Sequence, residues 1–390
     1  MTYSRGGNMD RQFQHSMLPQ ATHDELARQN FVKSLKLHIV KNLSPGNKRV
    51  YEQVVKPQFE REHQRSPQNR HEIRTAMQRH PHYRWWSALR RINQEMLWDA
   101  VNTSVERQLP ELIERAKQSD RQLGTLTLDP DFKIPVYQTA VDIHCMPGSY
   151  HSEYTADDLA AGATYDRGVY IYGAGWLGPL NDDMGLSIVN NYLKPKYPDF
   201  RPTKILDLGC SVGHSTLPYV DAYPEAEVYA IDIGAPMLRY AHARAEALGK
   251  RVHFSQQNAE RTHFEAASFD LIVSHILLHE IPLPAIRNVM RECDRLLAPG
   301  GMTIHVEAPL YSHMDAFSAF MYDWETANNN EPFWSAMREL DLTAVMTEAG
   351  FAADRVIQTF VPNGAWKTAA DNSQQGGGSR GSWFIVAATK

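Results

Sequence analysis

Short apolar runs alternate with longer amphipathic stretches through the second half of the chain. The apolar runs have the length and composition of buried strands. They lie at 204–208, 228–231, 251–254, 269–274, 302–306, 355–361 and 381–388. Stretches with apolar residues at helical spacing lie between them, as at 284–297 and 341–349. This alternation predicts an α/β fold with a mostly parallel sheet, and the last two runs, joined only by a loop, predict an antiparallel hairpin at its edge.

The first half of the chain has a different pattern. Apolar residues such as Leu89, Ile92 and Met96 recur at helical intervals and are interleaved with Arg and Gln. This pattern predicts a mainly α-helical region at 21–140, preceded by a disordered tail at 1–20. A segment rich in Tyr and Gly at 141–184 connects the helical region to the strand-containing domain at 185–390.

The turn after the first apolar run carries the most specific signal in the chain. It reads Asp207-Leu208-Gly209-Cys210-Ser211-Val212-Gly213. Glycine lets the backbone pass close to a ligand, and the N–H groups at the start of the following helix stay free to bind it. A dinucleotide site would have glycine in place of Ser211 and His214, and a P-loop would have a Gly-Lys-Ser/Thr that is absent here. A ligand-binding turn of another kind and an ordinary strand-to-helix turn both fit this sequence.

The turn resembles the first motif of class I S-adenosylmethionine-dependent methyltransferases, usually acid-x-Gly-x-Gly-x-Gly, with Ser211 at the middle glycine. The resemblance covers roughly residues 185–390 and implies a Rossmann-like, seven-stranded methyltransferase sheet. It also implies S-adenosyl-L-methionine as cofactor and S-adenosyl-L-homocysteine as product, with Asp232 at the ribose hydroxyls and Asn258 at the adenine edge. The residues that it assigns to cofactor binding are Asp207, Gly209, Cys210, Ser211, Gly213, Asp232, Ile233, Met237, Asn258, Ala259, Ser274 and Tyr172.

The segment after the fourth apolar run holds the candidates for proton transfer. In O-methyltransferases of the family, a histidine at the position of His279 takes the proton from the substrate hydroxyl, a role that its near-neutral pKa suits. We expect Glu280 to orient this histidine, with Glu307 as a rival base, whereas an amine or thioether acceptor would need no base. A metal is not expected, because Ile276 stands where a His-Glu-x-x-His site has its glutamate.

Two aromatic segments flank the motif and are candidates for the acceptor site. The segment at 141–184 stands where the family places a cap, with Tyr165 and Tyr172 near the methionine end of the cofactor; packing between the two regions is the alternative. The insert at 310–340 follows the fifth strand, where related enzymes build a substrate wall. Its candidates are Tyr311, Phe317, Tyr322 and Trp324. The alternative is that these aromatic residues lie on one face of a helix and pack in the protein core.

Length, charge and composition bear on the size of the core and on the expected location of the protein. The chain has 390 residues, a formal net charge of −5 and 43% hydrophobic residues, enough for a substantial core. No apolar run has the length of a membrane span, and no hydrophobic signal core stands at the N-terminus. The cysteines match neither a disulfide framework nor a zinc pattern. A cytoplasmic protein without a membrane span is the simplest expectation.

Charge is distributed unevenly, with roughly +8 up to Arg121 and roughly −13 after it. Arg84, Arg90 and Arg91 stand beside aromatic residues and could bind nucleic acid, since cations neutralise phosphates and rings stack on bases. The alternative is that the aromatic residues are core, while the arginines are solvated or paired with the acidic half. We favour the alternative, because the overall balance is acidic and no compact basic run occurs. Nucleic acid is therefore not the expected partner.

The sequence predicts methyl transfer from S-adenosylmethionine to a small organic molecule, with oxygen favoured over sulfur, nitrogen or carbon as the acceptor atom. The helical region is expected to complete the substrate pocket or to form a homodimer interface. RNA or protein methylation is the first alternative, although Ser274-His275-Ile276-Leu277 replaces the Asp/Asn-Pro-Pro-aromatic motif of nucleic-acid amino-methyltransferases. A non-catalytic interaction protein with a methyltransferase fold is the second alternative, and it would need a broken cofactor motif.

Overall fold

An eight-stranded sheet forms the centre of the computed structural model, which describes residues 12–118, 122–365 and 381–390. The strand order is β1-β4-β3-β2-β5-β6-β8-β7. The strands are β1 Thr125–Thr127, β2 Lys204–Leu208, β3 Glu227–Asp232, β4 His253–Gln256, β5 Phe269–His275, β6 Leu297–Glu307, β7 Val356–Pro362 and β8 Ser382–Thr389. Strands β1 to β6 run parallel, whereas β8 pairs antiparallel with both β6 and β7. The predicted parallel sheet with an antiparallel edge is thus confirmed.

All seven predicted strands form, and the sheet has an eighth strand, β1, that the sequence did not suggest. This strand has three residues and pairs in parallel with β4. The Glu246 carboxylate accepts the backbone N–H groups of Leu123 and Gly124 just before the strand, at 2.9–3.1 Å. A short strand with exposed and half-exposed side chains has no apolar pattern from which to predict it, and its place at the edge comes from these tertiary bonds.

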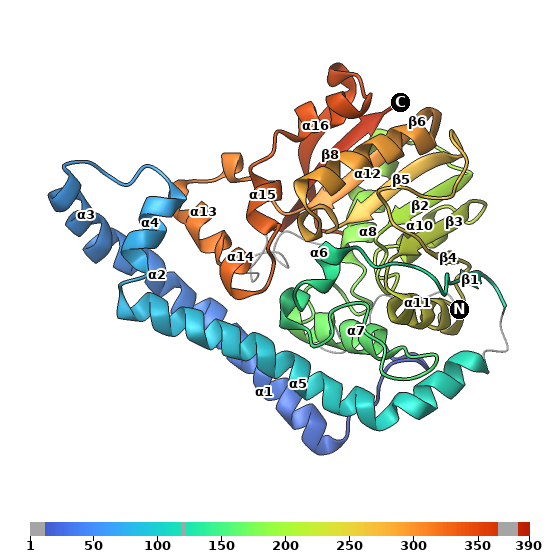
Figure 1. Ribbon diagram of the computed structural model, residues 1–390, viewed down its shortest axis with the longest axis horizontal. Helices are drawn as coiled ribbons and strands as arrows, with labels where there is room; N and C mark the ends of the chain where they lie inside the picture. The colour runs from blue at the N-terminus through green and yellow to red at the C-terminus, as the bar shows by residue number, and fades with distance from the viewer. Residues whose placement is uncertain (1–11, 119–121, 366–380) are drawn as a thin grey trace.

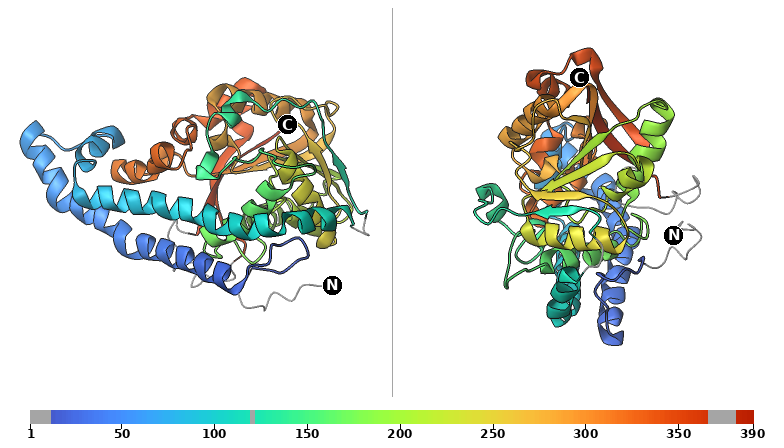
Figure 2. Two further views of the ribbon diagram at one scale, coloured as in Figure 1. Left: turned by 60° about the horizontal axis from the view of Figure 1, so that its bottom comes forward. Right: turned by 90° about the vertical axis from the view of Figure 1, so that its right-hand side faces the viewer.

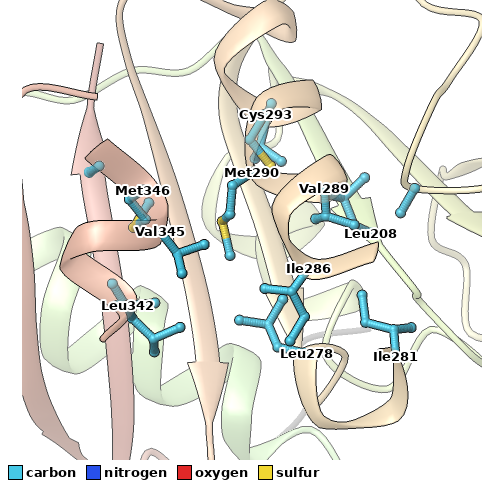
Figure 3. Packing of buried hydrophobic residues seen from close by; sticks show 14 of the residues in the cluster. Leu208, Leu278, Ile281, Ile286, Val289, Met290, Cys293, Leu342, Val345 and Met346 are labelled. Atoms are coloured by element: carbon cyan, nitrogen blue, oxygen red, sulfur yellow. The ribbon is translucent and has the colours of Figure 1, made fainter. Parts of the chain in front are cut away.

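Helices cover both faces of the sheet, because alternate residues of its strands point to opposite sides. The covering helices are α10 Leu217–Ala222, α11 Ala235–Ala247, α12 Leu283–Leu296 and α16 Leu342–Ala349. Ile205 and Leu271 pack on the face of α10 and α11, whereas Leu206 and Ile272 pack on the face of α12 and α16. Figure 3 shows apolar side chains of α12 and α16 pointing toward each other across this second face. The two cores fix the strands that carry the site.

The N-terminal region is helical, as predicted, and extends beyond the sheet as two long rods that run side by side (Figures 1 and 2). Its helices are α1 His23–His38, α2 Ser44–Val50, α3 Lys56–His63, α4 Arg70–Met77 and α5 Pro81–Lys117. π-helical turns at Ile39–Leu43 and Tyr51–Val55 join the first three helices into one rod. Thr22 and Glu25 form a capping box at the start of α1, and Pro81 occupies the first turn of α5, where its missing N–H costs nothing.

The tail expected at 1–20 falls mainly on residues 1–11, which lie outside the described residues. Residues 12–20 contact the body of the protein, since the Phe13 N–H donates to the Pro179 carbonyl at 2.9 Å. Within the described ranges, no helix is both long and apolar enough to cross a membrane.

Helix α7 (Ala160–Tyr172) joins the N-terminal rods to the sheet domain. It packs between α5 on one side and α11 on the other (Figure 1). Two glycines permit this close approach, because a Cβ on Gly162 would collide with Tyr240 of α11 and a Cβ on Gly168 with Trp98 of α5. The other short helices before β2 are α6 Val136–Thr139, a 3-10 turn at Ile143–Cys145, α8 Asp183–Ser187, a π-helical turn at Ile188–Leu193 and α9 Lys194–Lys196.

The aromatic insert at 310–340 lies between the N-terminal rods and the sheet (Figure 1). A 3-10 turn at Tyr311–His313 precedes α13 Ala316–Tyr322, α14 Trp324–Asn328 and α15 Trp334–Arg338. Phe320 and Trp324 pack with Trp86 of α5 in one apolar cluster. The insert is therefore part of the joint between the helical region and the sheet domain.

A buried carboxylate on α7, Asp166, ties this joint together. The side chains of Asp166 and Arg244 are each 1% exposed and form an ion pair at 3.2 Å. Burial raises the pKa of Asp166, but Arg244 and two imidazoles outweigh that effect and hold it well below its usual value. The other hydrogen-bond partners of the carboxylate are Gln12 Nε2 (3.1 Å), His15 Nε2 (3.1 Å), His214 Nε2 (2.8 Å) and Tyr240 Oη (2.9 Å).

Replacing Asp166 tests how much this cluster contributes to stability. In Asp166→Asn an amide N–H₂ would face hydrogen-bond donors, and the Arg244 charge would stay buried without its partner. We expect the free energy of unfolding in urea to fall by about 3–5 kcal/mol. The matched control is Asp221→Asn, whose side chain is 63% exposed beside Lys250 and whose loss should cost less than about 1 kcal/mol. Equal losses in the two variants would contradict the role assigned to Asp166.

Candidate functional site

A cavity lies at the carboxyl ends of the parallel strands, where open α/β sheets bind ligands. Its volume is about 620 Å³. The ends of β2, β3, β5 and β6 contribute Asp207, Asp232, His275 and Glu307. Helices α5 and α7 and the aromatic insert supply the facing wall. The sheet and the helical region thus share one site.

The turn after β2 forms the floor of this cavity. Gly209 and Gly213 have positive φ angles of 68° and 76°, and Ser211 between them is also left-handed, with φ at 52°. A residue with a side chain costs roughly 1–2 kcal/mol in that conformation, which is why glycine is the usual choice. The Ser211 N–H donates to Asp232 Oδ2 at 2.9 Å, and this bond holds the turn against the end of β3.

Two carboxylates at the ends of β2 and β3 face the turn. Asp207 accepts a hydrogen bond from Thr216 Oγ1 at 2.6 Å, and its other oxygen lies 3.3 Å from His275 Nδ1. Asp232 Oδ1 accepts the Gly234 N–H at 2.9 Å. Burial raises the pKa of Asp232. Because a carboxylate oxygen can accept more than one hydrogen bond, Asp232 can still bind two hydroxyl groups of a ligand.

The loop after β4 supplies a polar edge to the same cavity. Asn258 Oδ1 accepts the Glu260 N–H at 2.9 Å, which closes a local turn. The Glu260 carboxylate accepts Tyr137 Oη at 2.7 Å and Asn288 Nδ2 at 2.8 Å. The position of the Asn258 loop is therefore fixed from both sides.

The loop after β5 carries a buried histidine whose ring is fixed by a glutamate. His279 Nδ1 lies 2.7 Å from Glu307 Oε2, and the two side chains are 1% and 0% exposed. Glu307 also accepts the backbone N–H groups of Leu278 (2.6 Å) and Ala308 (3.1 Å). Burial lowers the pKa of His279, but Glu307 and then Glu280 outweigh it and raise the pKa above its usual value.

The positions of the two glutamates are the reverse of those expected from the sequence. Glu307, considered as a rival base, holds His279 Nδ1 and has its own oxygens occupied by backbone N–H groups. Glu280, expected to orient the ring, lies on the other side, with Oε1 at 3.9 Å from His279 Nε2. Among the residues that the structure describes, no group of three or more His, Cys, Asp or Glu side chains is arranged to hold a metal ion.

The strands and loops that carry the glycine turn, Asp232, Asn258 and His279 also match a known domain family. Residues 205–301 match the profile of the methyltransferase domain family. The chain contains a class I S-adenosylmethionine-dependent methyltransferase domain. The matched residues begin in β2 and end in β6, so they include the glycine turn, Asp232, Asn258 and His279.

Curated relatives match the same part of the chain. The demethylmenaquinone methyltransferase of Thermus thermophilus is 33% identical over 108 residues, which are 28% of this chain and 48% of that protein. The ubiquinone biosynthesis O-methyltransferase of Nitrosococcus oceani is 35% identical over 99 residues, 25% of this chain and 40% of that protein. A tRNA N(3)-methylcytidine methyltransferase of Drosophila melanogaster is 25% identical over 166 residues, 40% of this chain and 51% of that protein. The chain thus spans about half the length, or less, of these relatives.

Most residues expected to bind the cofactor line the cavity of the methyltransferase domain. They are Asp207, Gly209, Cys210, Ser211, Asp232, Ile233, Met237, Asn258, Ala259 and Tyr172. The three candidates for proton transfer line it as well, together with Tyr165 and Tyr322. Gly213 and Ser274 lie outside its lining: Gly213 faces Phe254, and Ser274 is fully buried with Oγ at 2.8 Å from His305 Nδ1.

Three residues of the insert that we expected to bind the acceptor lie outside the cavity. The ring of Tyr311 packs on the guanidinium of Arg338, 4.6 Å from its centroid. Phe317 stacks on Tyr51 with ring centroids 4.8 Å apart. Trp324 is 2% exposed within the apolar cluster shared with α5. Core packing explains Phe317 and Trp324, although they lie on two helices, α13 and α14, rather than on one helical face, and a buried cation explains Tyr311.

Helix α5 supplies a row of cavity residues that the sequence reading missed. Trp86, Arg90, Gln94 and Trp98 stand at every fourth position and all line the cavity. Residues four apart share one face of a helix, so this row was readable from the sequence, although the larger apolar stripe of α5 hid it. Arg90, considered for nucleic-acid binding, forms an ion pair with Glu325 of the insert instead.

His144 was also missed, and no sequence pattern marks it. Its carbonyl accepts Trp98 Nε1 (2.7 Å) and Gln94 Nε2 (3.1 Å) from the row on α5. Its ring bridges Glu280 (Nε2, 3.0 Å) and Glu331 (Nδ1, 3.1 Å). Burial lowers the pKa of His144, but the two carboxylates outweigh it and hold the pKa well above its usual value. A protonated His144 therefore links the segment before α7 to the insert.

The pairing of His279 with Glu307 predicts how the imidazole titrates. In Glu307→Gln the main opposing charge is gone, while burial and the charges of Glu280 and Glu331 remain, so the pKa of His279 should fall from its raised value. NMR titration of the labelled imidazole measures this shift. Glu348→Gln, whose side chain is 61% exposed on α16, is the control and should leave the titration unchanged. A His279 pKa that is the same in Glu307→Gln as in the parent protein would rule out the pairing.

Proposed function

We propose that this chain transfers a methyl group from S-adenosyl-L-methionine to a hydroxyl oxygen of a small organic molecule. The observation that carries the proposal is that the glycine turn with Asp232 and the His279–Glu307 pair face the same cavity. One side has the groups needed to hold the cofactor, and the other has a histidine positioned for proton transfer.

The residues of the turn and of the next two strand ends fit the cofactor. The open acceptor positions of Asp232 suit the two ribose hydroxyls, and Asn258 stands at the polar edge that would meet the adenine. Asp207 and the left-handed turn at Gly209 leave room for the methionine end. When bound, this cofactor supplies a methyl group activated by a positively charged sulfur, so the protein has to align the acceptor and exclude water.

His279 is suited to take a proton from the acceptor hydroxyl. Glu307 fixes Nδ1, which leaves Nε2 on the side of Glu280 and the cavity. A neutral imidazole oriented in this way can act as a general base, and the adjacent carboxylate stabilises the imidazolium that forms.

The helical wall that faces the strand ends across the cavity supports a small acceptor rather than a nucleic acid. Residues of α5 line the cavity, and so do Tyr165 and Tyr172 of α7. We propose that residues 141–184 act as the cap of the site. Relatives that act in quinone biosynthesis support a small acceptor, whereas the tRNA-modifying relative supports the alternative. Release of S-adenosylhomocysteine with tRNA, and with none of a panel of hydroxylated metabolites, would favour RNA.

Cofactor binding depends on Asp232 in this proposal. Asp232→Asn removes the negative charge and one acceptor oxygen, so the Kd for S-adenosylmethionine should rise by about 10- to 100-fold. Isothermal titration calorimetry measures this change, with the exposed Asp221→Asn as a matched control that should bind as the parent protein does. Undiminished affinity in Asp232→Asn would show that the cofactor sits elsewhere.

Turnover should depend on pH through His279, because only the neutral ring can accept a proton. The pKa of His279 lies above its usual value, so kcat should rise with pH through a value above about 6.5. His279→Ala should lower kcat by about 10²- to 10⁴-fold and leave the Kd for the cofactor unchanged. The assay is release of S-adenosylhomocysteine, and a flat pH profile with nearly full turnover in His279→Ala would exclude the base.

A further inference from the structure

Three glutamates line the part of the cavity where we propose that the methyl acceptor binds. Each has one carboxylate oxygen without a hydrogen-bond partner among the described residues. Glu325 pairs with Arg90, while Glu331 and Glu280 both contact His144, in every case through Oε1. Among the described residues, the Oε2 atoms of all three glutamates are buried and have no hydrogen-bond partner. The Glu325 and Glu331 side chains are only 10% and 2% exposed, and all three side chains line the cavity.

A buried carboxylate oxygen without a hydrogen-bond partner lowers the stability of a folded protein. A buried acceptor without a partner loses its hydration and gains nothing in return, at roughly 1–3 kcal/mol for each group and more for a charged one. Such atoms in a cavity wall point to a ligand that supplies the missing donors. The other oxygens of the same glutamates are anchored, so the unused ones are held in place for that ligand.

The charges around these oxygens favour a cation over a neutral donor. Three carboxylates face one guanidinium, Arg90, and one imidazolium, His144, and burial raises the pKa of Glu325, so the group carries at most one excess negative charge. Lys36 lies near Glu325, but burial and then Arg90 hold its pKa well below its usual value, which favours its neutral form. A hydroxyl group would supply a donor without supplying this charge, whereas a protonated amine supplies both.

Aromatic rings complete the surroundings of this charge. Trp86, Trp98 and Trp334 line the cavity with the glutamates, and ring faces attract cations. The Trp334 ring also meets the His279 ring edge-on, with centroids 4.8 Å apart. The anionic group of glutamates and the proposed base therefore lie within the span of one small molecule.

We infer that the methyl acceptor carries a protonated amine, which Glu325 and Glu331 bind while its hydroxyl group faces His279. This inference rests on the proposed function and names its substrate class. The ammonium group donates up to three hydrogen bonds and accepts none, which matches the partnerless Oε2 atoms of the three glutamates. The two glutamates are specificity residues rather than members of the proton-transfer pair.

Matched pairs of phenols and indoles test this inference on the unaltered protein. Tyramine is compared with 4-ethylphenol, and 5-hydroxytryptamine with 3-ethyl-5-hydroxyindole, by ligand-observed NMR titration of protein saturated with S-adenosylhomocysteine. Each pair differs in the amine but keeps the ring. We expect the amine to bind about tenfold or more tightly in at least one pair, because a desolvated charged pair is strengthened by burial. Equal or weaker binding of the amine in both pairs would overturn the inference.

Isosteric variants then assign the preference to the named residues. Glu325→Gln and Glu331→Gln keep an oxygen for Arg90 or His144 and remove a charge, so each should abolish most of the preference for the amine. Glu348→Gln, on the exposed surface of α16, is the matched control and should keep it. A preference that survives in both cavity variants would overturn the inference.

Binding of S-adenosylmethionine, measured separately by calorimetry, distinguishes this result from a failure of the proposed function. A protein that binds the cofactor but has no preference for amines keeps the proposed function and loses only the substrate class.

Discussion

A carboxylate can be buried only where opposite charge and hydrogen-bond donors surround it, and Asp166 meets this condition with groups from three other parts of the chain. Gln12 and His15 come from the segment before α1, His214 from the start of the turn into α10, and Arg244 from α11. None of these segments can move away without leaving a charge or a donor uncompensated. The helical wall of the cavity is therefore held at a set distance from the glycine turn.

The polar groups inside the cavity follow the same principle of pairing between distant segments. Glu307 at the end of β6 holds His279, Arg90 of α5 holds Glu325 of the insert, and His144 joins the insert to the loop after β5. In a site of low dielectric such pairs are strong, and an unpaired group is expensive. Ion pairs and hydrogen bonds thus hold the side chains that line the cavity, whereas apolar packing holds the sheet below them.

The sheet was predictable because its evidence is local: apolar runs of strand length, a glycine turn and a closing pair of strands. The polar edge of the cavity was predictable because Asp207 and Asp232 stand at the carboxyl ends of β2 and β3. The opposite wall of the cavity, formed by α5 and the insert, was not predictable. It depends on which helix lies against the cavity and on which residues of the insert face it rather than the core. Tyr311 and Trp324 serve packing instead, and His144 reaches the site through tertiary contacts that no local pattern records. The homodimer and the cytoplasmic location stay predictions.

The cavity is built from two separate parts of the chain. One part is the set of residues 86, 90, 94 and 98 on α5, and the other is the set of strand ends that carry the glycine turn. The glycine turn, Asp232 and Asn258 lie within residues 205–301, whereas the row lies on the earlier helix α5. None of the hydrogen bonds described for the glycine turn involves a residue of this face of α5. Because Trp86, Arg90 and Trp98 also hold the insert and α7, a change on this face of α5 would alter the joint between the helical region and the sheet together with the cavity wall.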